Sequence, residues 1–93
     1  MSFLAKGQQG TLRVAGRDAA VFRDWTFTPA PERGGPWRVT ASLVEADDYW
    51  LDSGSPVELR LALSHSRWRW RDVTFTRAGS GLTITGTGAP QEL

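Results

Sequence analysis

The chain has 93 residues, a formal net charge of +1, 40% hydrophobic residues and no cysteine. This length fits one domain with a single core, and the lack of cysteine excludes disulfides and thiolate metal sites. No apolar run reaches the ~18 residues of a membrane span, and the first residues lack the apolar segment of a signal peptide. We therefore expect a single β domain over residues 1–93, with neither a membrane span nor export.

Residues 1–9 show no regular pattern, and we expect a loose N-terminal arm. Phe3 and Leu4 are its apolar residues, and they either cover the end of the protein's own core or anchor a neighbouring subunit. Residues 88–93 contain Gly88 and Pro90 and are expected to form a C-terminal tail.

Residues 11–15 and 19–28 alternate apolar and polar side chains, which predicts two antiparallel strands. A two-residue turn at Gly16-Arg17 would join them and place Leu12 opposite Val21. Arg23 interrupts the apolar face of the second strand. It therefore lies at a barrel mouth or beside a β-bulge.

The middle of the chain contains a loop, a strand and a short helical segment. Three prolines and two glycines within residues 29–36 exclude regular structure there. Residues 37–44 alternate again and predict a strand. Residues 45–52 are acidic with an aromatic centre and are expected to form one short helical turn across an open end of the sheet.

Residues 57–75 form the clearest pattern in the chain, a hairpin with a two-residue turn at His65-Ser66. This register sets Leu61 opposite Trp70 on the buried face and Arg60 opposite Arg71 on the other face. The alternation fails near Arg71-Asp72, where one extra residue restores it. We predict a β-bulge there, which would set Val57 opposite Phe75.

The last strand is predicted at residues 82–87, with Leu82 and Ile84 inward. Six strands with regularly spaced turn residues indicate an all-β antiparallel domain, either a small barrel or a sandwich.

Enzymatic chemistry is not indicated. His65 is the only histidine, and its neighbours on a strand or turn supply neither an orienting acid nor an oxyanion site. The acidic residues of 45–52 lack the spacing of a calcium loop, and Gly79-Ser80-Gly81 is too short to hold a phosphate. We expect a non-enzymatic protein without catalytic residues, bound metal or cofactor.

Arg67, Arg69 and Arg71 alternate with two tryptophans, a composition found in single-strand nucleic-acid binders. A stacking platform needs exposed aromatic rings, whereas here the tryptophans share the face of the buried leucines. We therefore favour core tryptophans behind an arginine-lined outer face that contacts another subunit. Nucleic-acid binding through the three arginines is the alternative.

Tyr49, Trp50 and Leu51 form the best candidate contact patch, because aromatic residues are favoured as interface anchors. They could equally cap the core. A carbohydrate- or peptide-binding module that uses Trp37, Tyr49 and Trp50 is a further alternative.

Charge is unevenly distributed along the chain. Acidic residues cluster at 45–52, while Arg67, Arg69, Arg71 and Arg77 share one strand. These two regions either complement each other between copies of the chain or are two solvated surfaces.

Three stretches resemble small all-β structural proteins from the head, neck or tail of tailed bacteriophages: residues 10–18 followed by a tryptophan-containing strand, Trp68-x-Trp70 followed by Val73, and residues 82–90. The resemblance implies a small barrel or sandwich that packs in rings or lattices, and it transfers no catalytic residue. It also implies a virion location, or the host cytoplasm before assembly. We therefore expect a structural assembly protein that contacts other protein subunits as a homo-oligomer or with other virion proteins.

Overall fold

The computed structural model describes the backbone of residues 5–62 and 66–93, and side chains from residue 9 onward within those ranges. Strands dominate it, with one short helix between the third and fourth. The elements are β1 (Ala5–Val14), β2 (Arg17–Thr28), β3 (Trp37–Ala46), α1 (Asp48–Leu51), β4 (Val57–Ala62), β5 (Arg67–Ala78), β6 (Gly81–Gly86) and β7 (Gln91–Glu92).

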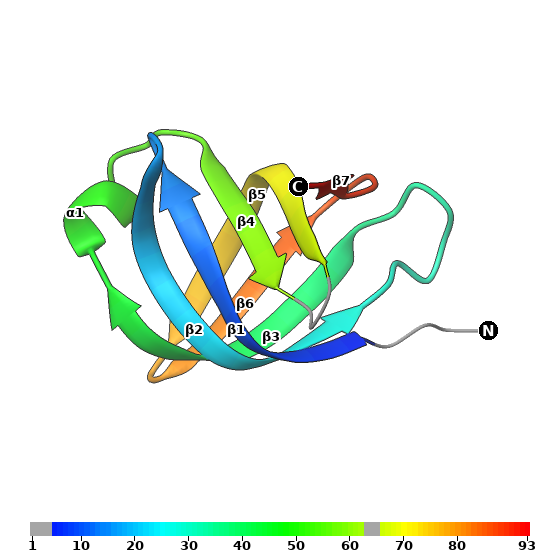
Figure 1. Cartoon of the computed structure of the whole chain (residues 1–93), viewed down its shortest axis with the longest axis horizontal. Helices are drawn as coiled ribbons and strands as arrows, with labels where there is room; N and C mark the ends of the chain where they lie inside the picture. The colour runs from blue at the N-terminus through cyan, green and yellow to red at the C-terminus, as the bar shows by residue number, and fades with distance from the viewer. Residues whose placement is uncertain (1–4, 63–65) are drawn as a thin grey trace.

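The first six strands close into an antiparallel barrel (Figure 1). The strand order is β4-β1-β2-β3-β6-β5, and β4 pairs with β5 to complete the ring. The short strand β7 is added to β5, where Trp68 pairs with Glu92. The predicted all-β antiparallel fold with about six strands is confirmed, and of the two predicted architectures the chain adopts the barrel.

The core lies inside the barrel and is built from alternate residues of every barrel strand. Period-two alternation sends these side chains inward and their neighbours to solvent. The buried hydrophobic residues are Leu12, Val14, Ala19, Ala20, Phe22, Trp25, Trp37, Val39, Leu51, Val57, Leu59, Leu61, Trp70, Val73, Leu82 and Ile84. Among the described residues, no polar or charged residue is buried.

The N-terminal arm is shorter than predicted, because β1 begins at Ala5 and Gly7 pairs with Trp25 of β2. The indole Nε1 of Trp25 donates a hydrogen bond to the Gln9 carbonyl oxygen at 3.0 Å. The backbone of this segment pairs with β2, and its sequence shows no alternation of apolar and polar residues, which explains why the pattern did not indicate a strand. Phe3 and Leu4 lie outside the described residues. In the predicted tail, Gln91–Glu92 form β7.

The turn between β1 and β2 is one residue earlier than predicted. Val14 pairs with Arg17, so the central turn residues are Ala15 and Gly16, whose φ angles are +53° and +78°. Two positive φ angles indicate a type I′ turn, whose twist matches that of the flanking strands. A register shift follows at once, and Leu12 pairs with Ala20 rather than with Val21.

The hairpin of β4 and β5 has the predicted faces but a register displaced by two residues. Leu61 pairs with Trp68 and Leu59 with Trp70. Arg67 pairs with Ala62, whereas the predicted two-residue turn at His65-Ser66 would set Arg67 opposite Ser64. Residues 63–65 lie outside the described residues. A shift of two residues keeps every side chain on its face, so alternation alone does not fix the register.

The bulge predicted at Arg71-Asp72 is confirmed. Val57 pairs with Val73 and Leu59 with Trp70, so three steps on β5 match two steps on β4. The predicted partner of Val57 was Phe75, and the two-residue register displacement accounts for the difference. Asp72 has φ of +54°, in the left-handed region.

A second bulge lies in β2 beside Arg23, which confirms the interpretation of the residue that interrupts the apolar face. Arg23 pairs with Ser42 and Thr26 with Thr40, so β2 again has one extra residue. Asp24 has φ of +54°, the same value as Asp72. Both bulges use an aspartate, a residue type that tolerates the left-handed conformation.

Replacing Asp72 with valine is expected to lower the free energy of unfolding by roughly 1–2 kcal/mol, because a β-branched side chain is strained at positive φ. Asp72→Asn is the matched control and should be nearly neutral, since asparagine accepts this conformation. Urea unfolding followed by tryptophan fluorescence measures both variants. Equal stabilities for the two variants would contradict this account of the bulge.

Candidate functional site

Among the described residues there is no cluster of three or more potential metal ligands. His65, the histidine considered for catalysis, lies outside the described residues. No helix in the described part of the chain is long and apolar enough to cross a membrane. The surface features that remain are an aromatic projection at one end of the barrel and a group of arginines on its side.

The aromatic projection is held in place by the short helix α1, which confirms the helical turn predicted within residues 45–52. Leu51 is buried at 7% exposure and attaches the helix to the core. The Asp47 amide donates a hydrogen bond to the Ala19 carbonyl oxygen at 2.7 Å, which fixes the chain to β2 before the helix. After it, the Ser53 hydroxyl donates to the Trp50 carbonyl oxygen at 2.7 Å.

Tyr49 is displayed on the outer side of α1, and Trp50 beside it is half-buried and packs against the core. The Tyr49 residue is 76% exposed, and its ring meets Trp50 edge to face with centroids 5.3 Å apart. The Arg17 guanidinium lies 4.9 Å from the centroid of the Trp50 ring. We call Tyr49, Trp50 and Arg17 the aromatic tip. Leu51, predicted with them as a contact residue, belongs instead to the core.

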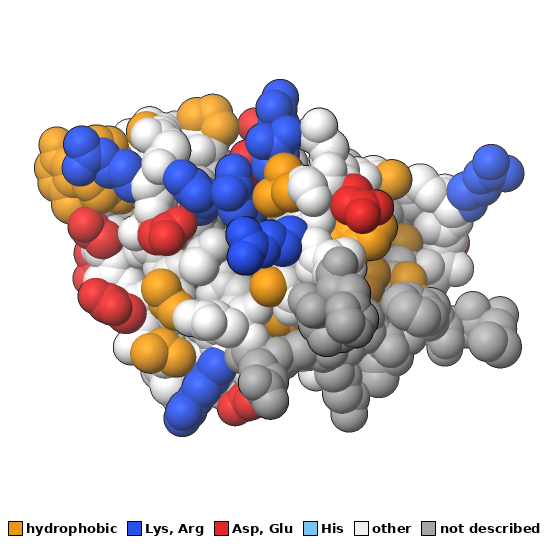
Figure 2. Space-filling view, in the orientation of Figure 1, with side chains coloured by type: hydrophobic (Ala, Val, Ile, Leu, Met, Phe, Trp, Pro, Cys, Tyr) orange, Lys and Arg blue, Asp and Glu red, His pale blue; other side chains and the backbone are white. Residues whose placement is uncertain are grey.

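Acidic side chains surround the aromatic tip. Glu45, Asp47 and Asp52 are exposed, and Figure 2 shows acidic side chains grouped beside the apolar projection at that end of the molecule. Asp48 accepts a hydrogen bond from Arg77 of β5. Arg77 was predicted to share a basic strand with Arg67, Arg69 and Arg71. It is instead paired with an acidic residue near the aromatic tip of its own chain.

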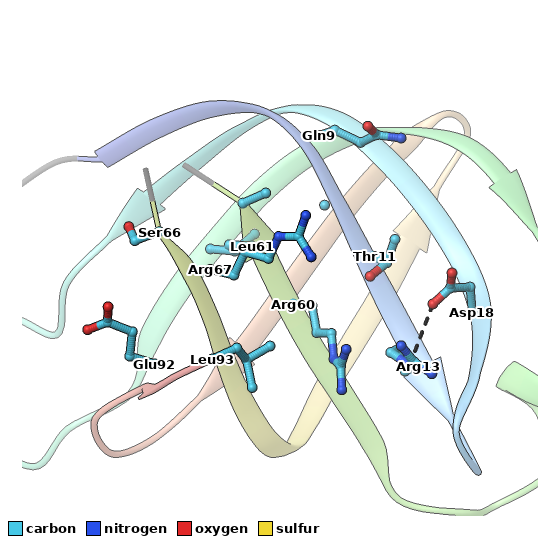
Figure 3. Close-up of a pocket in the computed structure, with 12 residues that line it drawn as sticks. Gln9, Thr11, Arg13, Asp18, Arg60, Leu61, Ser66, Arg67, Glu92 and Leu93 are labelled. Carbon is cyan, nitrogen blue, oxygen red and sulfur yellow. Dashed lines mark ion pairs between the residues drawn. The ribbon is translucent and has the colours of Figure 1, made fainter. Parts of the chain in front are cut away.

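The arginines on the side of the barrel come from three neighbouring strands. They are Arg13 of β1, Arg60 of β4, and Arg67, Arg69 and Arg71 of β5, and we call this set the arginine face. Figure 2 shows basic side chains gathered over the middle of the visible surface. In Figure 3, Arg13, Arg60 and Arg67 extend over the outer side of their strands. A hollow of about 990 Å³ lies among them, at the end of the β1–β4 ladder.

Glu58 makes the close approach of two of these arginines tolerable. Arg60 and Arg69 are direct cross-strand partners, an arrangement that is destabilising for like charges. The Glu58 carboxylate accepts a hydrogen bond from Arg60 Nε at 2.6 Å, and its other oxygen lies 3.6 Å from Arg69 Nε. Glu58 is thus the acid that compensates this pair of arginines. The predicted opposition of Arg60 to Arg71 is wrong, because the register places Arg69 opposite Arg60.

Within the described residues, no ion pair forms with Arg67 or Arg71, and both residues are exposed. Arg69 is more constrained, because it also donates a hydrogen bond to the Gln91 side-chain oxygen of β7. Arg13 is paired with Asp18 at 3.6 Å and donates to the Gly16 carbonyl oxygen at 2.5 Å. The face thus combines oriented and freely exposed guanidinium groups.

The tryptophans behind this face belong to the core. Trp37 and Trp70 are buried, with ring centroids 5.1 Å apart, and Phe27 stacks on Trp70 at 5.5 Å. Trp68 is partly buried, and its Nε1 donates to the Ser66 hydroxyl at 2.9 Å. Trp37 is therefore excluded from any surface ligand platform, and of the residues named for the carbohydrate- or peptide-binding alternative only Tyr49 and the half-buried Trp50 reach the surface.

These features define a small closed barrel with an aromatic tip at one end and an arginine face on its side. No protein-family model matches the chain, and no curated protein or solved structure matches it either.

Sequence reasoning found Tyr49, Trp50, Arg67, Arg69 and Arg71, and the structure brings the first two together and the last three together. It missed Arg13, Arg17 and Arg60 as members of these groups. Arg13 and Arg60 both alternate with apolar residues, so the sequence was sufficient to predict that their side chains face outward. Their proximity was not, because it depends on the pairing of β1 with β4.

Proposed function

We propose that this protein is a non-enzymatic structural protein that acts in assembly through protein–protein contacts, as a virion component of a tailed bacteriophage. The observation that carries the proposal is the aromatic tip, where Tyr49 is 76% exposed on a helix anchored by Leu51. The virion setting follows from the resemblance of residues 10–18, 68–73 and 82–90 to phage structural proteins. Its location would be the virion, or the host cytoplasm before assembly.

The aromatic tip has the properties of an interface anchor. Tyrosine, tryptophan and arginine are the residues that contribute most binding energy at protein interfaces, and all three meet here. Edge-to-face packing and the Arg17 guanidinium hold the Trp50 ring, so little side-chain freedom remains for that ring to lose on binding. The exposed Tyr49 ring, which packs on this fixed Trp50 ring, is better suited to a partner's pocket than to solvent.

The acidic rim of Glu45, Asp47 and Asp52 would select the partner. Complementary charge at the edge of an interface raises the association rate and excludes partners of the same charge. The partner surface is therefore expected to be basic and to contain an apolar pocket. We propose that another protein subunit supplies it, either a second copy of this chain or a different virion protein.

Replacing Tyr49 with alanine is expected to weaken self-association about 30-fold, because truncating an interface anchor removes about 2 kcal/mol or more. Sedimentation velocity and light scattering over a range of protein concentrations, at low and high salt, measure the change. Higher salt should weaken the wild-type oligomer as well, since the rim is charged.

Val44→Ala is the matched control for this experiment, because Val44 is another exposed apolar residue, 58% exposed on β3 and outside the aromatic tip. It should leave the oligomer unchanged. A wild-type protein that stays monomeric at every concentration and salt would contradict self-assembly. Equal weakening by both variants would contradict the assignment of the contact to the aromatic tip.

A further inference from the structure

The arginine face contains more positive charge than its own acidic neighbours neutralise. Within the part of the chain that the structure describes, its five arginines have two carboxylates at ion-pairing distance, Glu58 and Asp18, which leaves an excess of three positive charges. The whole chain has a net charge of only +1. The excess is therefore a local property of β1, β4 and β5. Glu92 lines the same hollow, and Asp72 lies beside Arg71, but within the described residues neither forms an ion pair with these arginines.

The geometry of the face suits a linear polyanion. Arg67, Arg69 and Arg71 project from alternate positions of one strand, so successive guanidinium groups start roughly 7 Å apart along a line. Arg60 and Arg13 extend the positive surface sideways across β4 and β1. In this row Arg67 and Arg71 are exposed, whereas Arg69 is held by Glu58 and Gln91. Such a line of cations matches a backbone that carries one negative charge per nucleotide.

The guanidinium groups are also oriented for anion binding. The Glu58 carboxylate accepts a hydrogen bond from Arg60 Nε, and among the described residues the terminal nitrogens of Arg60 donate no hydrogen bond. Arginine binds phosphate oxygens through paired N–H donors in a planar fork. Thr11 and Ser66 line the hollow beside Arg60 and Arg67 and supply hydroxyl groups of the kind that contact phosphate and sugar (Figure 3).

We propose that the arginine face binds the phosphodiester backbone of nucleic acid without reading its sequence. The buried state of Trp70 and the hydrogen-bonded, partly buried Trp68 leave no stacking platform on this face, so contacts are made to phosphate and sugar. This proposal is independent of the aromatic tip and of the proposed role in assembly.

The test is fluorescence anisotropy with a labelled 20-nucleotide oligothymidylate and with a labelled 20-base-pair duplex of mixed sequence. Neutralising about three phosphates predicts that raising NaCl from 50 to 200 mM weakens duplex binding about 40-fold and single-strand binding about 20-fold. Comparison of the two probes identifies which form of nucleic acid the face accepts. Changing the duplex sequence should leave the affinity unchanged.

The double variant Arg67→Ala/Arg71→Ala removes two exposed arginines that make no ion pair within the described residues. It should reduce the duplex salt effect from about 40-fold to about 4-fold, because one effective phosphate contact would remain. Arg33→Ala/Arg38→Ala removes the same charge from the 29–36 loop and β3, away from the face, and should retain most of the wild-type affinity. Circular dichroism verifies that both double variants are folded.

Three results would overturn the proposal. One is the absence of saturable binding to either probe at 50 mM NaCl. Another is an equal loss in both double variants, which would mean that overall charge rather than the arginine face governs binding. The third is a loss of self-association in Arg67→Ala/Arg71→Ala without any binding of oligonucleotide by the wild type, which would assign the face to a subunit contact. Tyr49→Ala should leave oligonucleotide binding intact, so this test is separable from that of the aromatic tip.

Discussion

Replacing Trp25 with alanine is expected to lower the free energy of unfolding by about 3–5 kcal/mol, because the side chain is one of the largest in the core and its residue is 1% exposed. Domains of this size are stable by only about 5–15 kcal/mol, so the loss is a large fraction of the total. It corresponds to a fall in melting temperature of roughly 15–30 °C. Calorimetry and urea unfolding measure the two quantities.

The contribution of the Trp25 hydrogen bond to the free energy of unfolding can be separated from the contribution of the size of the Trp25 side chain. Trp25→Phe removes the Nε1 donor that reaches the Gln9 carbonyl oxygen, whereas Trp70→Phe removes a buried Nε1 that has no hydrogen-bond partner within the described residues. The first variant should therefore be less stable than the second by about 0.5–1.5 kcal/mol. The opposite order would contradict the view that this bond fixes the N-terminal half of β1 to β2.

Replacing Gly10 with alanine is expected to destabilise the barrel by about 1–3 kcal/mol through overpacking. A Cβ atom at this position would overlap the Cε2 and Cζ atoms of the Phe22 ring and lie 3.0 Å from Leu61 Cδ2. Phe22 is fully buried, so its ring cannot move into solvent. The backbone of β1 thus needs a glycine here because a ring packs directly against it. Urea unfolding measures the loss.

A second substitution tests the cause of this loss. In the double variant Gly10→Ala/Phe22→Leu the shorter side chain removes the overlap, so the two changes should cost less together than the sum of their separate effects. Gly54→Ala is the comparison glycine, since a Cβ there meets no atom within 4 Å and its cost comes only from a φ of +80°. Strict additivity of the first pair would contradict the steric explanation.

Alternation in the sequence was sufficient to predict the class of fold, most strand positions and the Asp72 bulge. It was insufficient for pairing register, because a two-residue displacement of β4 against β5 keeps Leu61 and Trp70 on the buried face. It also missed the start of β1, where glycines and glutamines give no alternation although the backbone pairs with β2. Periodicity reports which face a side chain occupies, whereas register depends on turn geometry and on the residues across the ladder.

The candidate surfaces were also predictable only in part. Tyr49 was predictable as an exposed contact residue because it lies among acids in a short segment. Leu51, two residues later, was assigned to the same patch. Because the segment is helical, Leu51 lies on the opposite side of α1 from Tyr49 and is buried in the core. Arg13 and Arg60 meet only through the β1–β4 ladder, a contact between segments more than 40 residues apart that no local pattern indicates.

Closure of the barrel has a consequence for how this protein meets other molecules. Each of the six barrel strands has two neighbours in the ring. β7 pairs with β5 at Trp68 and Arg69, before the β5–β6 ladder begins at Thr74, and the Leu93 amide donates to the Arg67 carbonyl oxygen at 2.9 Å. Unpaired strand edges are the templates on which other chains add strands, in regulated complexes and in amyloid alike. Contacts formed by this barrel are therefore expected to use side chains. Surface substitutions can then change the affinity or the partner of a contact while the backbone hydrogen bonds between the strands stay intact.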